Sequence, residues 1–496
     1  MEDREQVEEA LVDTKEGINE HEHDNKIRYN NETKNDITSG GGGGNSFLYL
    51  SALTSNLLMI SCSTNFTWTS PMLKILTNSD PVINPLGTPI TPLQQSWFTS
   101  LFGLGAVFGP IFFGKLADII GRKKLLMLLA IPNIAGFSIL AVASDIRVYC
   151  LVRFVLGAVT GVVYAILPIY LTEISELGNR GMLGSFMSVF SNLGILLVFV
   201  IGPYLSVKQL SICCAVPTLL FAIFFGIFIP ESPVYLVTKG DRAEATKSLM
   251  KLRQRSSRHV EAELHLITKN VEKQTEVGTV GDLFKERSLR RALFICFTLP
   301  VFQQISGLQV VNSFLGPILD STKTGLSTYT STVIIGIVRM FVVVTATALI
   351  DRVGRKVLLL VSTLGCFLTL TLLGMYFHLD KSEVFDIESF SWLPVISLTF
   401  FMAFFNVGLV GIPFLLPSEL FPPKFKSLGS SLVSFSSFGF YFLVVMSYPI
   451  ISHWYGIELC FWMFSGGTLL GVVFIYFMVP ETKGKTYNDI KKFLEK

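Results

Sequence analysis

Gln303-Gln304-Ile305-Ser306-Gly307-Leu308-Gln309 is a polar insert in the apolar stretch 291–320, which is long enough to cross a membrane. Asn312 and Ser313 follow one turn later. Lipid offers no hydrogen-bond partners, so these amides must face protein or water. At about 100° per residue, an arc of roughly 160° holds Gln303, Ser306, Gly307, Gln309 and Ser313. This stripe predicts either a hydrogen-bonding wall for a neutral polyol or polar contacts between helices.

The composition indicates a protein with many membrane spans. Half of the 496 residues are hydrophobic and only 16% are charged, which is not typical of a soluble protein of this length. The net charge of +3 is small and gives no reason to expect nucleic acid as a partner. The seven cysteines lie in or beside apolar runs without paired or metal-ligand spacing, so we expect reduced thiols, no metal and no cofactor.

Apolar runs of near ~20 residues predict an all-α fold of twelve transmembrane helices in two sets of six. A charged bridge with two helix-like runs separates the sets, and a Gly-rich acidic segment precedes them. The predicted organisation is a disordered tail at 1–46, a six-helix bundle at 47–229, a helical linker at 230–290, a second bundle at 291–480 and a tail at 481–496.

Lysine and arginine gather in alternate loops, which predicts the orientation. Arg122, Arg180, Arg355 and Lys426 lie in loops of the same side as the basic bridge. Because basic loops stay in the cytoplasm, both termini and the bridge are expected there. The sequon at Asn65 then falls outside, where a glycan is expected.

One phrase occurs twice, at corresponding places in the two sets of spans. Residues 118–123 follow the second span, and residues 351–356 follow the eighth with the same Asp, Gly, Arg and Lys positions. A second pair matches likewise: Glu173 precedes Arg180 by seven residues, and Glu419 precedes Lys426 by seven. Acids contribute little to topology, so we interpret these carboxylates as cytoplasmic latches between helix ends, paired with arginines of the other loops. The latch residues named by this argument are Asp118, Arg122, Glu173, Arg180, Asp351, Arg355, Glu419 and Lys426.

At these motifs the chain resembles the sugar porter branch of the major facilitator superfamily, which includes animal glucose transporters and insect trehalose facilitators. The resemblance runs from about residue 47 to the end, and its further marks are 230–233, 303–307, 417–422 and 480–484. It implies two pseudo-symmetric six-helix bundles around a central site, alternating access, and a bridge of short cytoplasmic helices. By similarity, Glu231 and Glu481 join the latch residues.

The site departs from that family more than the frame does. Gln303 and Gln304 match the family's paired sugar-binding glutamines, while Gln309 stands where an Asn is usual. Ser313 and Phe314 replace a tyrosine pair of the outer gate. Fewer amides and smaller aromatic side chains suggest a substrate other than glucose. The substrate-binding residues expected from the resemblance and the polar stripe are Gln303, Gln304, Gln309, Asn312, Arg339, Asn406, Phe414, Phe438, Ser188 and Asn192.

Arg339 is the departure that carries most information, because the family usually has an Asn there. A guanidinium in the middle of a span costs several kcal/mol unless it is hydrated or paired. No Asp or Glu is found deep in the twelve predicted spans. One interpretation is a structural arginine held by carbonyls, and the other is a carrier for an organic anion or oxidised ascorbate.

Proton coupling requires a titratable group inside the membrane, and the proton-linked relatives place a carboxylate in the first span near an Arg that resembles Arg153. Phe47 to Trp68 contains neither Asp nor Glu, which favours facilitated diffusion over symport. Arg153 is then expected to be held by carbonyls or lipid phosphate.

Other classes fit less well. No catalytic Ser/His/acid set, metal cluster or phosphate loop is present, so an enzyme is not expected. Paired latches argue against a channel, and a sugar receptor that has lost transport stays open as an alternative. We expect a monomer in the plasma membrane whose partners are a small-molecule substrate, a sugar or polyol, and the lipid bilayer.

Overall fold

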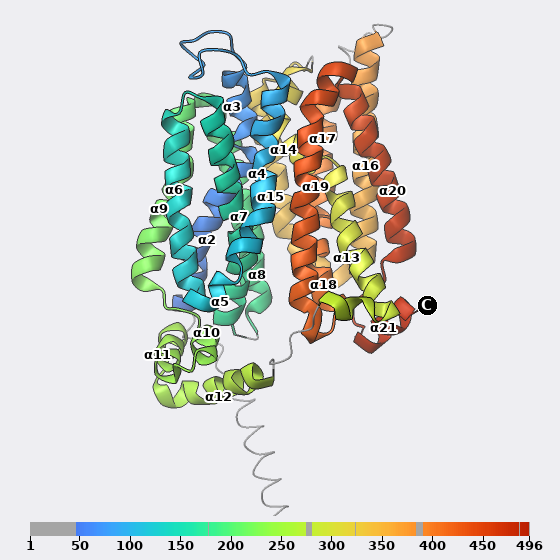
Figure 1. Ribbon diagram of the computed structural model, residues 1–496. Helices are drawn as coiled ribbons and strands as arrows, with labels where there is room; N and C mark the ends of the chain where they lie inside the picture. Colours follow the sequence, from blue (N-terminus) through green and yellow to red (C-terminus); the bar gives the residue numbers. More distant parts are fainter. Residues whose placement is uncertain are drawn as a thin grey trace, which may run out of the picture.

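The computed structural model describes residues 46–176, 178–273, 280–322, 324–382, 390–485 and 487–495. The predicted disordered tail lies outside these residues apart from Ser46. The described residues form α-helices and short 3₁₀ helices and no strand. Twelve helical segments are long and apolar enough to cross a membrane, which confirms the predicted all-α membrane fold (Figure 1).

The first six spans form the N-terminal bundle. A short helix, α3 (Thr69–Leu76), continues the first span, and another, α5 (Leu116–Ile120), follows the second. The six spans are α2 (Ser46–Thr67), α4 (Pro92–Phe113), α6 (Arg122–Val142), α7 (Ile146–Ile174), α8 (Arg180–Ile201, extended by η1 at Gly202–Tyr204) and α9 (Val207–Phe228).

The charged bridge folds into α10 (Pro233–Thr238), α11 (Arg242–Arg253), α12 (Ser257–Lys273) and η2 (Val280–Phe284). In Figure 1, α10, α11 and α12 lie beneath the N-terminal bundle, whereas η2 packs on α13 (Arg287–Ile305) of the C-terminal bundle. We call this end of the molecule the bridge end, and the end that carries α3 the distal end. The two helix-like runs expected in the bridge correspond closely to α11 and α12.

The last six spans form the C-terminal bundle, and two of them are broken. They are α13 (Arg287–Ile305) with α14 (Leu308–Asp320), α15 (Thr328–Val353), α16 (Arg355–Ser382), α17 (Leu393–Val407) with α18 (Ile412–Leu420), α19 (Lys426–Tyr455) and α20 (Ile457–Met478). The tail ends in α21 (Tyr487–Glu495), which packs on α13. The Lys491 ammonium lies 3.0 Å from the Glu286 carboxylate and ties this helix to the start of α13.

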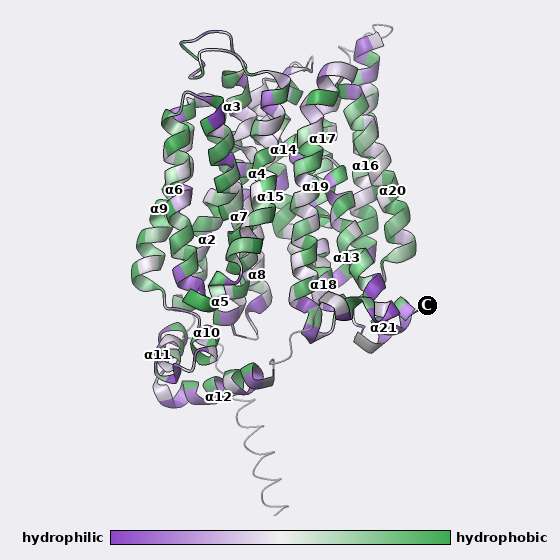
Figure 2. Ribbon diagram, in the orientation of Figure 1, coloured by the Kyte–Doolittle hydropathy of each residue, from purple (hydrophilic) through white to green (hydrophobic). Residues whose placement is uncertain are grey.

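Hydropathy is distributed as a membrane requires. Figure 2 shows apolar residues along the spans and hydrophilic ones at the helix ends and in the bridge. Large apolar side chains such as Phe112, Leu151 and Phe341 are exposed at the level of the spans. In lipid such exposure carries no hydrophobic cost, so these faces are suited to acyl chains.

Glycine permits the closest helix contact in the N-terminal bundle. Gly105 and Gly109 of α4 face Gly157 and Gly161 of α7, and a Cβ at any of the four would clash with backbone of the opposite helix. Small residues at this spacing let membrane helices approach closely, where van der Waals contact replaces the missing hydrophobic drive.

The two bundles meet mainly along three helix pairs. α4 packs on α19, α8 on α15, and α3 on α14. In the first pair the ring of Phe102 lies 5.7 Å from that of Tyr441, and Ser100 Oγ donates to Met446 Sδ at 3.3 Å. These contacts position helices of both bundles around the residues described next.

Candidate functional site

The polar insert lies where the seventh span breaks. α13 ends at Ile305 and α14 begins at Leu308, while Gly307 between them is left-handed, with φ 79°. Ser306 closes α13, since its Oγ donates to the Gln303 carbonyl at 2.6 Å. The prediction of one continuous polar stripe was therefore wrong. The break divides the polar residues into two groups with different partners.

The two glutamines before the break cross-link helices of the C-terminal bundle. Gln303 Nε2 donates to the Leu409 carbonyl at 2.6 Å, and Gln304 Nε2 donates to Ser437 Oγ at 2.9 Å. Both side chains are buried, and among the described residues Gln304 Oε1 has no hydrogen-bond partner. Leaving a buried acceptor without a donor costs the folded protein about 1–3 kcal/mol. This oxygen is therefore suited to accept a hydrogen bond from a hydroxyl group of a solute.

The residues after the break join an amide network that spans both bundles. Arg339 of α15 donates from Nε to Asn192 Oδ1 of α8 at 2.6 Å, and from Nη1 to Asn312 Oδ1 of α14 at 2.7 Å. Asn312 Nδ2 in turn donates to Gln309 Oε1 at 3.2 Å. Four of the ten expected substrate-binding residues thus form one hydrogen-bonded chain, although they come from three helices.

Arg339 and Arg153 are both buried arginines, but their surroundings differ. Arg339 is held by amide oxygens, has no carboxylate partner among the described residues, and keeps 5% of its surface exposed. Arg153 is 0% exposed, and its Nη1 donates to the Asn65 carbonyl at 2.8 Å over the Phe102 ring. Its Nε and Nη2 are sealed without partners in the described structure. A carbonyl therefore anchors Arg153, as one of the two expectations stated.

The other expected substrate-binding residues are less closely connected. Asn406 Nδ2 donates to the Met402 carbonyl at 2.7 Å, and the Phe438 ring meets Tyr164 of the N-terminal bundle edge-on at 6.3 Å. Ser188 contributes its carbonyl, which accepts from Asn192 Nδ2 at 2.9 Å. Phe414 is 42% exposed, and no described contact joins it to the amides.

A hydroxyl cluster in the N-terminal bundle was missed by the sequence analysis. Ser63 Oγ donates to Ser191 Oγ at 2.8 Å, and Tyr164 Oη lies 3.0 Å from Ser191 Oγ. Ser191 precedes Asn192 in the chain, and Tyr164 is the residue whose ring contacts Phe438. Polar side chains in otherwise apolar spans were the available signal, but the sequence analysis followed mainly the amides and charges and did not single out Ser63, Tyr164 or Ser191.

The glycan expected at Asn65 does not fit the structure. Asn65 is 0% exposed, lies within α2, and is packed inside the bundle beside Arg153. An attached glycan needs an exposed amide nitrogen in a surface segment. The sequon was misleading because α2 and α3 continue the helical path past it to Leu76.

At each copy of the repeated motif at the bridge end, a glutamate carboxylate caps the start of a helix. Glu231 Oε1 accepts from the Lys123 backbone N–H at 2.8 Å, at the start of α6. Glu481 accepts from the N–H groups of Arg355 at 2.9 Å and Lys356 at 3.1 Å, at the start of α16. Each carboxylate satisfies N–H groups that the first turn of a helix leaves free.

The ion pairs expected at the latch acids lie within each bundle. The Arg122 guanidinium lies 3.1 Å from Glu173 and 3.0 Å from Asp118, and the Arg355 guanidinium lies 3.2 Å from Glu419. Thr482 Oγ1 donates to Glu419 at 2.5 Å. Glu173 and Glu419 pair with arginines of another loop, as predicted, whereas Asp118 pairs with Arg122 of its own loop, and these described pairs do not bridge the two bundles.

Two predicted latch residues with described side chains do not join these pairs. Arg180 and Lys426 begin α8 and α19, where both are exposed, and no described interaction involves their side chains. The side chain of Asp351 lies outside the described part of the chain.

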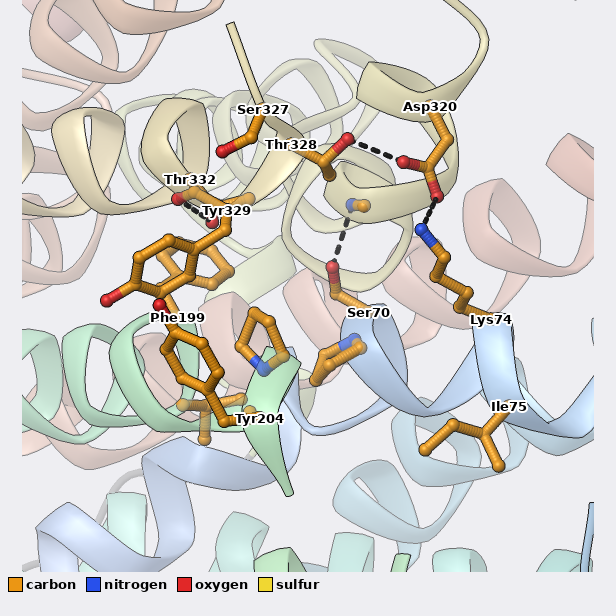
Figure 3. A pocket seen from close by; sticks show the side chains of 15 residues that line it. Ser70, Lys74, Ile75, Phe199, Tyr204, Asp320, Ser327, Thr328, Tyr329 and Thr332 are labelled. Carbon is orange, nitrogen blue, oxygen red and sulfur yellow. Dashed lines mark hydrogen bonds and ion pairs between the residues drawn. The ribbon is translucent and has the colours of Figure 1, made fainter. Parts of the chain in front are cut away.

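At the distal end, polar contacts bridge the two bundles. Ser70 Oγ of α3 accepts from the Gly316 backbone N–H of α14 at 2.9 Å. The Lys74 ammonium lies 3.1 Å from the Asp320 carboxylate (Figure 3). The bundles are therefore in contact at the distal end, while the described ion pairs of the bridge end stay within each bundle.

A model of the family described as "Sugar (and other) transporter" matches residues 43–494. The chain belongs to this sugar transporter family. It is 32% identical over 406 residues to the facilitated trehalose transporter Tret1 of Bombyx mori, with 81% of this chain and 79% of the relative covered. The Tret1 of Apis mellifera ligustica is 31% identical, with 89% and 87% covered. The chain spans about half of the Tret1 of Drosophila mojavensis, 51% of its length.

Among solved structures, the inward open conformation of the xylose transporter XylE from E. coli matches with a TM-score of 0.74 at 19% identity, covering 90% of this chain and 99% of that one. This likeness confirms the major facilitator fold. The chain is thus a member of the sugar transporter family with many apolar helices long enough to cross a membrane.

Proposed function

We propose that this transporter carries a sugar by facilitated diffusion, with the substrate bound between the bundles at the amide network. The observation that carries the proposal is the chain from Asn192 through Arg339 and Asn312 to Gln309, which joins both bundles. Amides can both donate to and accept from hydroxyl groups, as a neutral polyol requires. Because the network crosses between bundles, their relative movement must break it and release a solute bound there.

Uniport is proposed because the first span offers no group to carry a proton. α2 contains no Asp or Glu, and Arg153 is bonded to a carbonyl instead of a carboxylate. The insect relatives are named facilitated transporters, whereas XylE is titled a proton symporter. Trehalose is therefore the first solute to test.

We further propose that the protein is a monomer in the plasma membrane. Its bridge end and both termini would lie in the cytoplasm. The basic loops at the bridge end support this orientation. The distal end would then face the outside. The domain limits proposed from the sequence, 47–229 and 291–480, agree with the use of two bundles as the moving parts.

A second candidate substrate is an organic anion or oxidised ascorbate. The observation that favours it is Arg339, a buried cation whose described partners are two amide oxygens and the Met402 sulfur, with no carboxylate among them. A guanidinium binds carboxylates by charge-assisted hydrogen bonds, which are roughly twice as strong as neutral ones.

Counterflow in proteoliposomes tests the proposal. Purified full-length protein should exchange labelled trehalose or a hexose at equal rates at pH 5.5 and 7.5, and Gln304→Ala should raise the KM about fivefold, since one hydrogen bond to a neutral group is worth about 1 kcal/mol. Ser434→Ala serves as the control, because Ser434 is exposed on α19 and donates only within its own helix, to Ser430. Binding without exchange would identify a receptor instead, and exchange of gluconate alone an anion carrier.

A further inference from the structure

A cavity of about 350 Å³ lies at the distal end, between the bundles. Its walls come from α3, α8 and η1 of the N-terminal bundle and from α14 and the start of α15 of the C-terminal bundle (Figure 3). The volume is within the range of roughly 300–1,000 Å³ that small-molecule sites occupy. None of the residues of the amide network lines it, so it is separate from the central site.

The lining combines aromatic faces with hydroxyl groups. Tyr204 of η1 and Tyr329 of α15 meet edge to face with ring centroids 4.5 Å apart, one ring from each bundle. Ser70 and Thr328 add hydroxyls, and Figure 3 shows these side chains around one space. Aromatic rings give an apolar face with a polar edge, and hydroxyls both donate and accept hydrogen bonds.

The charges in the lining cancel. The Lys74 ammonium pairs with Asp320 at 3.1 Å, and Thr328 Oγ1 donates to the same carboxylate at 2.5 Å. An ion entering here would find its opposite charge already occupied. The lining is therefore suited to a neutral ligand that presents C–H faces and many hydroxyls, which is the chemistry of a saccharide.

We propose that this cavity is a second, distal saccharide site that acts on the conformation of the carrier. Its walls come from both bundles, so the cavity exists only while the bundles are in contact at the distal end. A ligand that binds one conformation alone shifts the population toward it. A saccharide in the cavity thus holds the distal end shut and slows the step that reopens it. The inference shares its ligand class with the proposed function but uses a different site.

Equilibrium binding of labelled trehalose to the purified full-length protein tests the second site. Gln304→Ala should weaken one of two binding components and leave the other unchanged, and adding Tyr204→Ala should weaken that other component at least tenfold. Tyr204 is 69% exposed at the end of its helix, so its truncation spares the core. Tyr455→Ala is the control, because Tyr455 is an exposed tyrosine at the distal end of α19 outside the cavity.

Two results would overturn the proposal: no component that survives Gln304→Ala, or a surviving component that Tyr204→Ala leaves unchanged. If the proposed function at the central site is wrong, a different result is expected. Gln304→Ala would then leave trehalose binding unaffected, and the protein would show no counterflow.

The conformational effect has its own measurement. Ser100 on α4 is buried against Met446 of α19 and is absent from the cavity lining. In a Ser100→Cys, Gln304→Ala background, saturating trehalose should slow modification by an impermeant maleimide severalfold, and Tyr204→Ala should abolish the protection. Unchanged or faster modification with trehalose bound would contradict the proposed closure.

Discussion

Two arginines in the spans show how burial alone fails to identify a functional residue. Arg153 is sealed, its partner is a backbone carbonyl, and its guanidinium lies 4.8 Å from the centre of the Phe102 ring. Arg339 is also buried, but it instead holds two side-chain amides from different bundles. The contacts of Arg153 stabilise one bundle. In the proposed function, the Arg339 guanidinium can instead replace one of its amide partners with an oxygen of the substrate.

Replacing Arg339 by Asn should separate the two candidate substrates. If gluconate inhibits sugar counterflow through the guanidinium, Arg339→Asn should raise its inhibition constant between about tenfold and a hundredfold, since a hydrogen bond to a charged group is worth about 1.5–3 kcal/mol. Inhibition constants for gluconate and sugar uptake are measured together. Arg153→Met is the matched control, because it removes a cation away from the network. If Arg339→Asn changes neither quantity, Arg339 has no substrate role.

The kinds of residue in the candidate site could be predicted from the sequence. Which of them contact one another could not. Amides in apolar spans are conspicuous in the sequence because lipid cannot satisfy them. Which amide meets which depends on how three helices of two bundles pack, so the contact of Asn192 with Arg339 has no local signal. The burial of Asn65 was missed for the same reason: a sequon reports three residues and not the depth of the helix that carries them.

At the scale of elements, the spans were predictable and their breaks were not. A run of about 20 apolar residues follows from the thickness of the bilayer, so all twelve spans were expected close to where they lie. The seventh and tenth are each divided into two helices. Ser306-Gly307 was read as part of a polar face, although a glycine after a helix-closing serine also fits a left-handed helix end.

The break at Gly307 should resist substitution. In Gly307→Ala, the new Cβ would lie 2.5 Å from Phe464 Cδ2, in a conformation with φ 79° that L side chains rarely adopt. We expect a loss of about 1–3 kcal/mol in the free energy of unfolding. Gly439→Ala is the control: nothing lies within 4 Å of that Cβ in α19, and alanine should stabilise the helix by about 0.5–1 kcal/mol. Thermal unfolding in detergent measures both, and equal shifts would refute the account.

The Glu481 cap predicts a pH dependence. Partial burial opposes ionisation of this carboxyl, but N–H groups of Lys483, Arg355, Lys356 and Thr482 outweigh burial and hold its pKa below the ordinary value of 4.5. A carboxyl with a lowered pKa stabilises the folded state above the ordinary value, and this stabilisation is lost as the pH falls through the folded pKa.

The unfolding temperature of Glu481→Gln should therefore lie below that of the unsubstituted protein at pH 7, and the two should converge as the pH falls from the ordinary value of 4.5 through the lowered folded pKa. Glu495→Gln is the control, because Glu495 is an exposed acid at the end of α21 with a long contact of 3.9 Å to Lys491. A gap that is constant with pH would show that the charge of Glu481 does not contribute.

At the scale of the whole molecule, the internal repeat explains what each bundle keeps fixed. Glu231 and Glu481 cap equivalent helices, and a Cβ at Gly121 or Gly354, both with positive φ, would meet the capping carboxylate. These caps join groups within a bundle, so they can persist while the bundles move. The contacts that must change are those between bundles, which in this conformation include the polar contacts at the distal end.

The pair formed by Lys74 and Asp320 should control how often the distal end opens. Both groups are partly exposed, so the pair is worth about 0.2–1 kcal/mol, or up to about fivefold in the closed-to-open ratio. In a Ser100→Cys background, Lys74→Glu should speed modification by an impermeant maleimide up to about fivefold, because two carboxylates then face each other. The exchanged double variant Lys74→Glu, Asp320→Lys restores attraction and should return the rate to that of the background. Lys208→Glu, an exposed change at the distal end of α9, should leave the rate unaltered. If the double variant reacts as fast as Lys74→Glu alone, the two bundles are held together at this end by packing and not by this pair.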